Sequence, residues 1–260
     1  MITLSREEII YYKKSRFNDI VVTKKDSEVI LRSPFKTKQS VVDIENQWNL
    51  CLEYTRHMLY GLSFCPQPEA LLCLGLGAGA LPRVLAKYLP KTTIDIVEID
   101  PEIVYVANTF FNFKVSKNMR LFIEPCEVFV KKPNKHHYNI IFNDAYIGNY
   151  QPNNIIQRAF YKMLCTHLAP AGILVCNVIS DEPTIYKKTL KSISSFLPYI
   201  YLLHCDTTIN TVVFASRKKI VTQENTLNEH FAFFNSYNRK IKRLPLYFRF
   251  NLSLRRMLKS

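Results

Sequence analysis

The 260-residue sequence predicts an α/β fold, with a mostly parallel sheet covered by helices on both faces and a small antiparallel β appendage in front of it. Three observations lead to this prediction. Residues 71–100 have the order apolar strand, glycine-rich turn, helix and second apolar strand. Strand and helix patterns then alternate as far as Ile179, which is typical of a parallel sheet. The last two strand patterns are separated by a short polar segment, which predicts a closing antiparallel hairpin.

The glycine-rich turn is the stretch around which the prediction is organised. Residues 71–74 are short and apolar, as expected of a buried strand. Gly75, Gly77 and Gly79 follow, and the absence of a Cβ there lets the backbone turn tightly and approach a ligand. Residues 81–89 then show apolar side chains at helical spacing.

Two carboxylates accompany the end of the next apolar strand, residues 94–99. Glu98 and Asp100 lie on one side of this strand because strand side chains alternate. A carboxylate about 20 residues after the glycines suits the two hydroxyls of a ribose, so the pattern predicts a nucleoside-type cofactor. The alternative is a structural turn with surface acids. The tight G-L-G-A-G spacing, with Pro101 opening a new helix, favours an adenosyl-sulfonium ligand over NAD.

The N-terminal 50 residues differ from the middle of the chain. Residues 19–22 and 28–32 are rich in β-branched side chains and flank a polar turn, which predicts a hairpin. The polar residues 36–40 are expected to break this β structure. Apolar residues with four-residue spacing then predict an amphipathic helix over residues 49–62.

Further elements follow the second strand in sequence order. The predicted helices cover residues 101–110, 128–130, 155–168 and 183–197, and the predicted strands cover 120–123, 138–142, 173–179, 199–203 and 211–215. Pro170 and Gly172 are expected to stop the third of these helices. Ligands of such sheets bind at the carboxyl ends of the strands. The candidate site residues are therefore the groups at strand ends: Gly75, Gly77, Gly79, Glu98, Asp100, Glu124, Cys126, Asp144 and Tyr146.

Composition and charge narrow the class of protein. An apolar share of 48% is ordinary for a globular protein with a full core. The seven cysteines form no C-x-x-C pair, which argues against a zinc site and against a disulfide framework. No signal peptide and no membrane-spanning segment is evident, so we expect a cytoplasmic protein with reduced thiols and no metal.

The sequence divides into three regions: an N-terminal β region (1–50), a cofactor-binding domain (51–217) and a C-terminal tail (218–260). The tail interleaves basic and aromatic residues. Such a tail can bind an anionic partner such as nucleic acid or a lipid surface, or it can pack its aromatics on the domain. The net charge of +14 leaves the same two interpretations open, an anionic partner or a solvated lysine-rich surface.

Seven segments of the sequence together resemble one known family. They are Gln39-Ser40, YTRHML from Tyr54, LGLGAGALPRVL from Leu74, VEIDPEIV from Val97, NDAY from Asn143, LAPAGILVCNVI from Leu168 and NTVVFA from Asn210. These segments are similar to those of the spermidine synthase-like family, short bacterial branch, over roughly residues 20–217. The resemblance implies a Rossmann-like, seven-stranded methyltransferase-type domain and an S-adenosylmethionine or decarboxylated S-adenosylmethionine cofactor. It also implies a homodimer formed through the N-terminal β region.

The resemblance also implies roles for individual residues. Glu98 would bind the ribose, and Gln39 and Tyr54 would roof the cofactor. Asp144 would take the proton from an attacking amine as a general base, and Tyr146 would shape the acceptor pocket. For Asp144 the alternative is a strand-end acid that caps the next turn, and for Tyr146 it is core packing.

The sequence departs from the family pattern at three positions. Ala78 stands where aminopropyltransferases have an Asp that grips the aminopropyl ammonium. Ile147 stands where their second loop acid is expected, and Pro125, beside Glu124, stands near their adenine-side Asp. An ammonium without a carboxylate partner is costly in a closed site, so these departures weigh against polyamine synthesis.

Two classes of function therefore remain open. The first is an enzyme that transfers an alkyl group to an amine-type acceptor, with methyl transfer narrowly favoured and aminopropyl transfer as the alternative. The second is a protein that kept the fold but lost turnover and uses its basic tail for binding.

Overall fold

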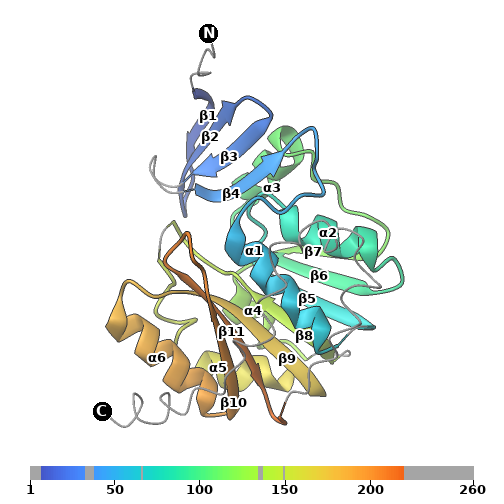
Figure 1. Ribbon diagram of the computed structural model, residues 1–260, viewed down its shortest axis with the longest axis vertical. Helices are drawn as coiled ribbons and strands as arrows, with labels where there is room; N and C mark the ends of the chain where they lie inside the picture. Colours follow the sequence, from blue (N-terminus) through green and yellow to red (C-terminus); the bar gives the residue numbers. More distant parts are fainter. Residues whose placement is uncertain (1–6, 33–37, 66, 134–136, 149, 220–260) are drawn as a thin grey trace.

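The computed structural model describes residues 7–32, 38–65, 67–133, 137–148 and 150–219, which form two sheets and the helices around the larger one (Figure 1). The predicted α/β fold is confirmed. Apart from its first two residues, the predicted basic tail lies outside the described residues. Within the described residues, none of the helices is both long and apolar enough to cross a lipid bilayer.

The small sheet has four antiparallel strands in sequence order: β1 (Glu8–Lys14), β2 (Asp19–Lys25), β3 (Glu28–Arg32) and β4 (Lys38–Asp43). The predicted hairpin is β2 and β3, which pair in antiparallel register. Strand β1 was not predicted. The break expected over residues 36–40 was wrong from Lys38 onward, because β4 pairs with β3 from Lys38 to Asp43. Its buried residues are Val41 and Val42, so the polar residues before them sit on an edge strand that tolerates them.

The large sheet has seven strands in the order β10-β11-β9-β8-β5-β6-β7. Its strands are β5 (Ala70–Leu74), β6 (Thr93–Glu98), β7 (Met119–Ile123), β8 (Tyr138–Asn143), β9 (Leu168–Ile179), β10 (Tyr199–His204) and β11 (Asn210–Ser216). Strands β5 to β9 run parallel, whereas β11 is antiparallel to both β9 and β10. The predicted parallel sheet with a closing antiparallel hairpin is therefore confirmed.

Helices cover both faces of the large sheet. One face carries α1 (Glu53–Met58), the 3-10 helix η1 (Leu59–Ser63), α2 (Ala80–Tyr88) and α3 (Pro101–Phe110), and the other carries α4 (Cys126–Phe129), α5 (Arg158–Thr166) and α6 (Pro183–Ser194). Strand β5 shows why both faces are buried. Its Leu71 and Cys73 belong to the core on the α2 side, and Leu72 and Leu74 belong to the core on the α5 side.

Three predicted helices are shorter than expected, and one of them is α6, which ends at Ser194 instead of Leu197. Helix α1 begins at Glu53 instead of Asn49, and the Arg56 guanidinium donates hydrogen bonds to the backbone oxygens of Leu50 and Cys51, both at 2.7 Å. These two backbone oxygens therefore have hydrogen-bond donors without belonging to a helix.

Helix α5 ends at Thr166, and Pro170 and Gly172 lie inside β9 instead of between a helix and a strand. The register between β8 and β9 is irregular at this point, and Pro170 is exposed. A Cβ on Gly172 would lie 2.9 Å from the backbone oxygen of Tyr138, so this close approach of the two strands requires glycine.

The small sheet docks on the α2 and α3 side of the large one. Its apolar residues Ile20 and Leu31 share a core with Ala107 of α3. The Ser15 hydroxyl, in the loop after β1, donates to the Asp100 carboxylate at 2.5 Å. This docking holds β4 close to the carboxyl ends of the parallel strands, because both line one pocket described below.

Candidate active site

A pocket of about 150 Å³ lies between the small sheet and the carboxyl ends of β5, β6, β8 and β9. Its walls come from the small sheet, α1, α3, the glycine turn, the strand ends, the loop after β8 and the loop between β10 and β11. Its lining includes the predicted residues Gln39, Tyr54, Gly75, Gly77, Glu98, Asp144 and Tyr146. The structure thus brings together seven of the eleven predicted site residues around one cavity.

The glycine turn forms one wall of this pocket. Gly75 has a φ of +93°, and a Cβ there would lie 2.5 Å from the backbone oxygen of Asp144. The backbone N–H of Ala78 donates to the Ser40 hydroxyl at 3.2 Å, which ties the turn to the small sheet. Gly75 therefore has to be glycine for the turn to pack against the segment after β8, and Gly75 and Gly77 both line the cavity.

Glu98 lies at the end of β6 and is only 8% exposed. Its carboxylate accepts the backbone N–H of Leu76 at 2.9 Å and that of Asp100 at 3.0 Å. Burial raises the pKa of Glu98, and these backbone hydrogen bonds oppose the rise. A carboxylate oxygen can accept a second hydrogen bond, so Glu98 retains capacity for hydroxyl groups in the pocket.

Asp144 follows β8 and faces the same pocket. Burial raises its pKa from 3.8 to about 6, while the hydrogen bond from Asn177 works against the rise. The Asn177 amide donates to Oδ1 of Asp144 at 2.8 Å, which fixes the orientation of the carboxylate. A carboxylate with a raised pKa in a pocket is suited to accept a proton near neutral pH.

The roof of the pocket comes from the small sheet and α1. The Tyr54 hydroxyl donates to the backbone oxygen of Gln39 at 3.0 Å. The Gln39 amide donates to the backbone oxygen of Gly148 at 2.6 Å, and the backbone N–H of Gly148 donates to Asn18 at 2.6 Å. The loop after β8 is thereby fastened to the roof.

Two asparagines of the site were missed by sequence reasoning. The Asn210 amide donates to Oδ1 of Asn177 at 2.9 Å, so a chain of amides runs from β11 through β9 to Asp144. The Tyr146 hydroxyl donates to the backbone oxygen of Asn177 at 3.1 Å. The NTVVFA segment begins at Asn210, but no sequence signal placed its side chain in the site, because that depends on strand pairing.

A smaller pocket of about 60 Å³ shares Gly75, Glu98 and Tyr146 with the larger one. Glu124 and Cys126 line it, as predicted for strand-end groups. Glu124 pairs with Lys132 at 2.6 Å. Burial raises the pKa of the Cys126 thiol to about 12, so this side chain is neutral near pH 7.

Asp100 and Gly79 are absent from the residues that line the two pockets. Asp100 caps the N-terminus of α3 by accepting the backbone N–H of Glu102 at 3.0 Å. Gly79 precedes α2 with a φ of +72°, and a Cβ there would lie 2.3 Å from the ring of Phe113. In the structure both residues shape the fold around the site.

Known proteins share both the sequence pattern and the fold. Residues 53–227 match the spermine/spermidine synthase domain. The chain is 33% identical over 186 residues to the polyamine aminopropyltransferase of Vibrio vulnificus, a match that covers 69% of this chain and 62% of that protein. It is 27% identical over 195 residues to the eEF1A lysine and N-terminal methyltransferase of Bos taurus, covering 67% of this chain and 28% of that protein. The chain thus spans less than two thirds of either relative.

Solved structures show the same architecture. A probable spermidine synthase from Corynebacterium glutamicum superposes with a TM-score of 0.72 at 17% identity, covering 82% of both chains. Human methyltransferase-like protein 13 in complex with SAH superposes with a TM-score of 0.62 at 22% identity, covering 72% of this chain and 93% of that one.

The two sheets define a methyltransferase-like α/β fold, preceded by a small antiparallel β sheet, with a pocket at the strand ends. Within that class, the chain belongs to the spermine/spermidine synthase domain family. The predicted resemblance is therefore confirmed.

Proposed function

We propose that this protein is an alkyl transferase that binds S-adenosylmethionine or its decarboxylated form and transfers an alkyl group, with methyl favoured, to an amine-type acceptor. The observation that carries the proposal is the pocket in which the glycine turn, Glu98 and Asp144 meet. Both relatives reported above carry transferase names, one of an aminopropyltransferase and one of a methyltransferase.

The described residues fit an adenosyl group. Gly75 and Gly77 line the pocket without a side chain, so a ligand can approach the backbone of this wall closely. Glu98 is a buried acceptor with spare lone pairs, as the ribose hydroxyls need. Gln39 and Tyr54 would cover the group from above, and Glu124 and Cys126 would lie beside it in the smaller pocket.

When bound, such a cofactor supplies a carbon that is activated by a positively charged sulfur. The protein then has to position the acceptor nitrogen and remove its proton. We assign proton removal to Asp144, whose carboxylate is oriented by Asn177 and whose pKa is raised to about 6 by burial. Tyr146 would shape the acceptor side of the pocket, with its hydroxyl held by the backbone of Asn177.

The charge of the pocket favours methyl transfer. The acidic side chains in its lining are Glu98 and Asp144. Ala78 is fully buried and uncharged at the position where aminopropyltransferases hold the aminopropyl ammonium. Ile147 lines the smaller pocket in place of a second loop acid. An aminopropyl group and an amine acceptor would together bring more positive charge than these two acids can pair.

Aminopropyl transfer is the second candidate, and the 33% identity to the Vibrio vulnificus aminopropyltransferase supports it. The two candidates differ in the cofactor that the pocket prefers. We therefore expect calorimetric titration of the purified full chain to show binding of S-adenosylmethionine. The decarboxylated form with putrescine should give no product. Tight binding of the decarboxylated form alone, with putrescine turnover, would exclude methyl transfer, and binding of neither cofactor would exclude both candidates.

The pH dependence of turnover provides a further prediction. Only the deprotonated Asp144 can accept a proton, and its pKa of about 6 lies above the ordinary value of 3.8. Turnover with saturating ligands should therefore fall as pH drops through about 6, roughly tenfold per pH unit. The measurement is kcat from pH 4.5 to 8 with two amine acceptors of different basicity. If kcat falls near pH 6 with both acceptors, the titrating group belongs to the protein. If the pH of the fall changes with the basicity of the acceptor, Asp144 is not the group that titrates.

A further inference from the structure

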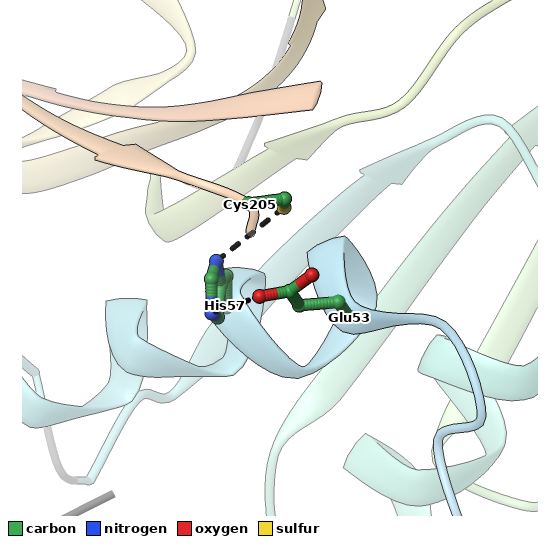
Figure 2. A group of neighbouring side chains, drawn as sticks. All are labelled: Glu53, His57 and Cys205. Atoms are coloured by element: carbon green, nitrogen blue, oxygen red, sulfur yellow. Dashed lines mark hydrogen bonds and ion pairs between the residues drawn. The ribbon is translucent and has the colours of Figure 1, made fainter. Parts of the chain in front are cut away.

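A second cluster of chemically reactive side chains lies beside the pocket, on elements far apart in the sequence. Glu53 and His57 are four residues apart on α1, and Cys205 follows β10 (Figure 2). The sulfur of Cys205 lies 3.5 Å from Nδ1 of His57, and Nε2 of His57 lies 3.7 Å from Oε1 of Glu53. One candidate ligand atom from each residue lies within 4.8 Å of the others.

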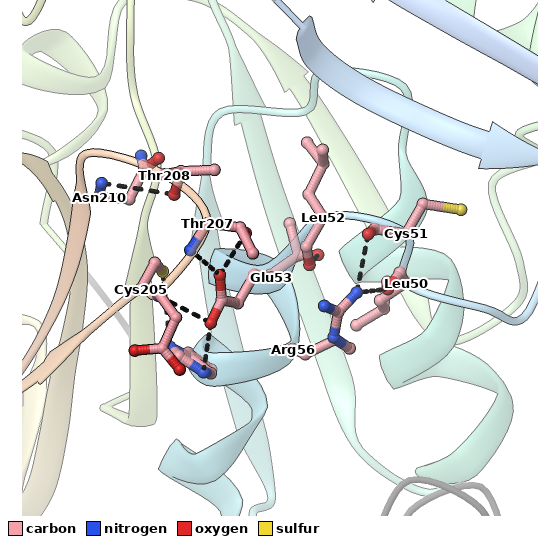
Figure 3. Close-up of polar contacts among 12 residues, drawn as sticks. Leu50, Cys51, Leu52, Glu53, Arg56, Cys205, Thr207, Thr208 and Asn210 are labelled. Carbon is pink, nitrogen blue, oxygen red and sulfur yellow. Dashed lines mark hydrogen bonds and ion pairs between the residues drawn. The ribbon is translucent and has the colours of Figure 1, made fainter. Parts of the chain in front are cut away.

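Hydrogen bonding accounts for part of this cluster. The Glu53 carboxylate accepts the backbone N–H groups of Asp206 and Thr207 at 3.0 and 2.9 Å and the Thr207 hydroxyl at 2.5 Å (Figure 3). These bonds fasten α1 to the turn between β10 and β11. The Cys205 thiol and Nδ1 of His57 also lie within hydrogen-bond distance at 3.5 Å, whereas the 3.7 Å between Nε2 of His57 and Glu53 is a charge contact too long for a hydrogen bond. A carboxylate has about four acceptor positions, so three bonds leave one position for another partner.

The three donor types of the cluster, and the spacing of two of them, match a zinc coordination shell. Zinc takes thiolate at about 2.3 Å and imidazole at about 2.0 Å, so two such ligands in tetrahedral geometry lie about 3.5 Å apart. The observed separation between Cys205 Sγ and His57 Nδ1 is 3.5 Å, so this pair has the spacing of two zinc ligands. Glu53 lies against Nε2, the other ring nitrogen, and its carboxylate has to turn toward Nδ1 to complete the shell around one ion. The Glu53 side chain is 12% exposed and His57 is 8% exposed, so two of the three residues are largely shielded from water.

The charge states also suit a metal. Burial lowers the pKa of His57, so its ring is neutral and can coordinate near pH 7. The carboxylates of Glu53 and Asp206 add negative charge nearby. The neighbouring Arg56 guanidinium donates to the backbone oxygens of Leu50 and Cys51 (Figure 3). A thiolate, an imidazole and a carboxylate together favour Zn²⁺ over the harder cations Mg²⁺ and Ca²⁺.

We propose that Glu53, His57 and Cys205 form a zinc site with three protein ligands and one position left for water. The site joins α1 to the loop between β10 and β11. The same two elements line the larger pocket through Tyr54 and Ile209, so a bound ion would hold two walls of the pocket together. Sequence spacing could not reveal this site, because 148 residues separate His57 from Cys205.

Proton release accompanies metal binding at this site. Burial raises the pKa of the Cys205 thiol to about 11, so the metal-free thiol is protonated near neutral pH. Zinc must displace that proton, and the affinity should rise with pH. The expected stoichiometry is one ion bound and one proton released from Cys205.

Metal titration of the purified full chain tests the proposal. The chain is stripped with a chelator and then titrated with Zn²⁺, and separately with Co²⁺ as a coloured probe. We expect one equivalent to bind and cobalt to show a sulfur-to-metal charge-transfer band. Cys205→Ser and His57→Gln should each lower the affinity at least about tenfold and remove or change this band. Cys65→Ser, which changes another half-buried free cysteine, is the matched control and should leave binding unchanged.

A second measurement works without any variant, in case Cys205→Ser or His57→Gln fails to fold. Alkylation of the wild-type chain with and without one equivalent of Zn²⁺ is mapped by mass spectrometry. Selective protection of Cys205 among the seven cysteines supports the site. Equal alkylation of Cys205 in both samples, or unchanged zinc binding by folded Cys205→Ser, would overturn the proposal. The cluster would then only join α1 to the β10–β11 loop through hydrogen bonds.

Discussion

Replacing Asp144 by asparagine is expected to lower turnover by about 10²- to 10⁴-fold, the usual contribution of a general base. The substitution removes the proton acceptor but keeps its shape. The amide oxygen of the new side chain can still accept the hydrogen bond that Asn177 now donates to Asp144 at 2.8 Å. Cofactor affinity should therefore change by no more than a few-fold. Steady-state kinetics and calorimetry on the same preparation separate the two effects.

Asp181→Asn is the matched control for this experiment. Asp181 is an exposed carboxylate in the segment after β9, and it is absent from the linings of both pockets. Its removal takes one negative charge from the same edge of the sheet and should change turnover less than about twofold. If Asp144→Asn is as active as Asp181→Asn, then Asp144 is a strand-end cap and the proposed chemistry is wrong.

Gly79→Ala is expected to destabilise the protein by about 2–5 kcal/mol. A φ of +72° is unfavourable for any residue with a Cβ, by about 1–2 kcal/mol. The new Cβ would also lie 2.3 Å from the ring of Phe113, a fully buried side chain. Crowding of this kind costs about 1–3 kcal/mol more. Urea or thermal unfolding measures the sum.

A double-mutant cycle separates the backbone strain from the crowding. Phe113→Leu alone should also destabilise the protein, because it leaves space in the core. The double variant should cost less than the sum of the two single variants by about 0.5–3 kcal/mol, since the smaller side chain makes room for the new Cβ. Strict additivity would show that Phe113 does not constrain Gly79, and only the φ penalty would remain.

The sequence predicted the large sheet well because its signals are local. Strand β5 alternates between two cores, the glycines have positive φ, and Pro101 opens α3, each feature being set within a few residues. The polar strand β4 was missed because its side chains resemble a loop and its pairing with β3 is not visible locally. The extension of β9 through Pro170 and Gly172 was missed because proline and glycine usually end elements.

The residues of the candidate site likewise divide into those that the sequence predicted and those that it missed. Glu98 is the last residue of β6 and Asp144 directly follows β8, so the topology of the parallel sheet placed them together at one edge. Asn177 and Asn210 meet only because β9 and β11 pair in antiparallel register, which fixes contacts between residues 33 positions apart. The position of Asp100 at the cap of α3 was not predicted either, because a strand-end acid serves a ribose or a helix equally well on sequence grounds.

The docking of the small sheet has a consequence for how the family's catalytic domain can be divided. The matched family segment begins at residue 53, after the last strand of that sheet. Two residues of β4 nevertheless form hydrogen bonds with the site: Gln39 with the loop after β8, and Ser40 with the glycine turn. A fragment cut at the family boundary would keep its acids and its glycines but would open them to bulk solvent. Ligand preference can therefore change through substitutions in the first 50 residues while the parallel sheet stays as it is.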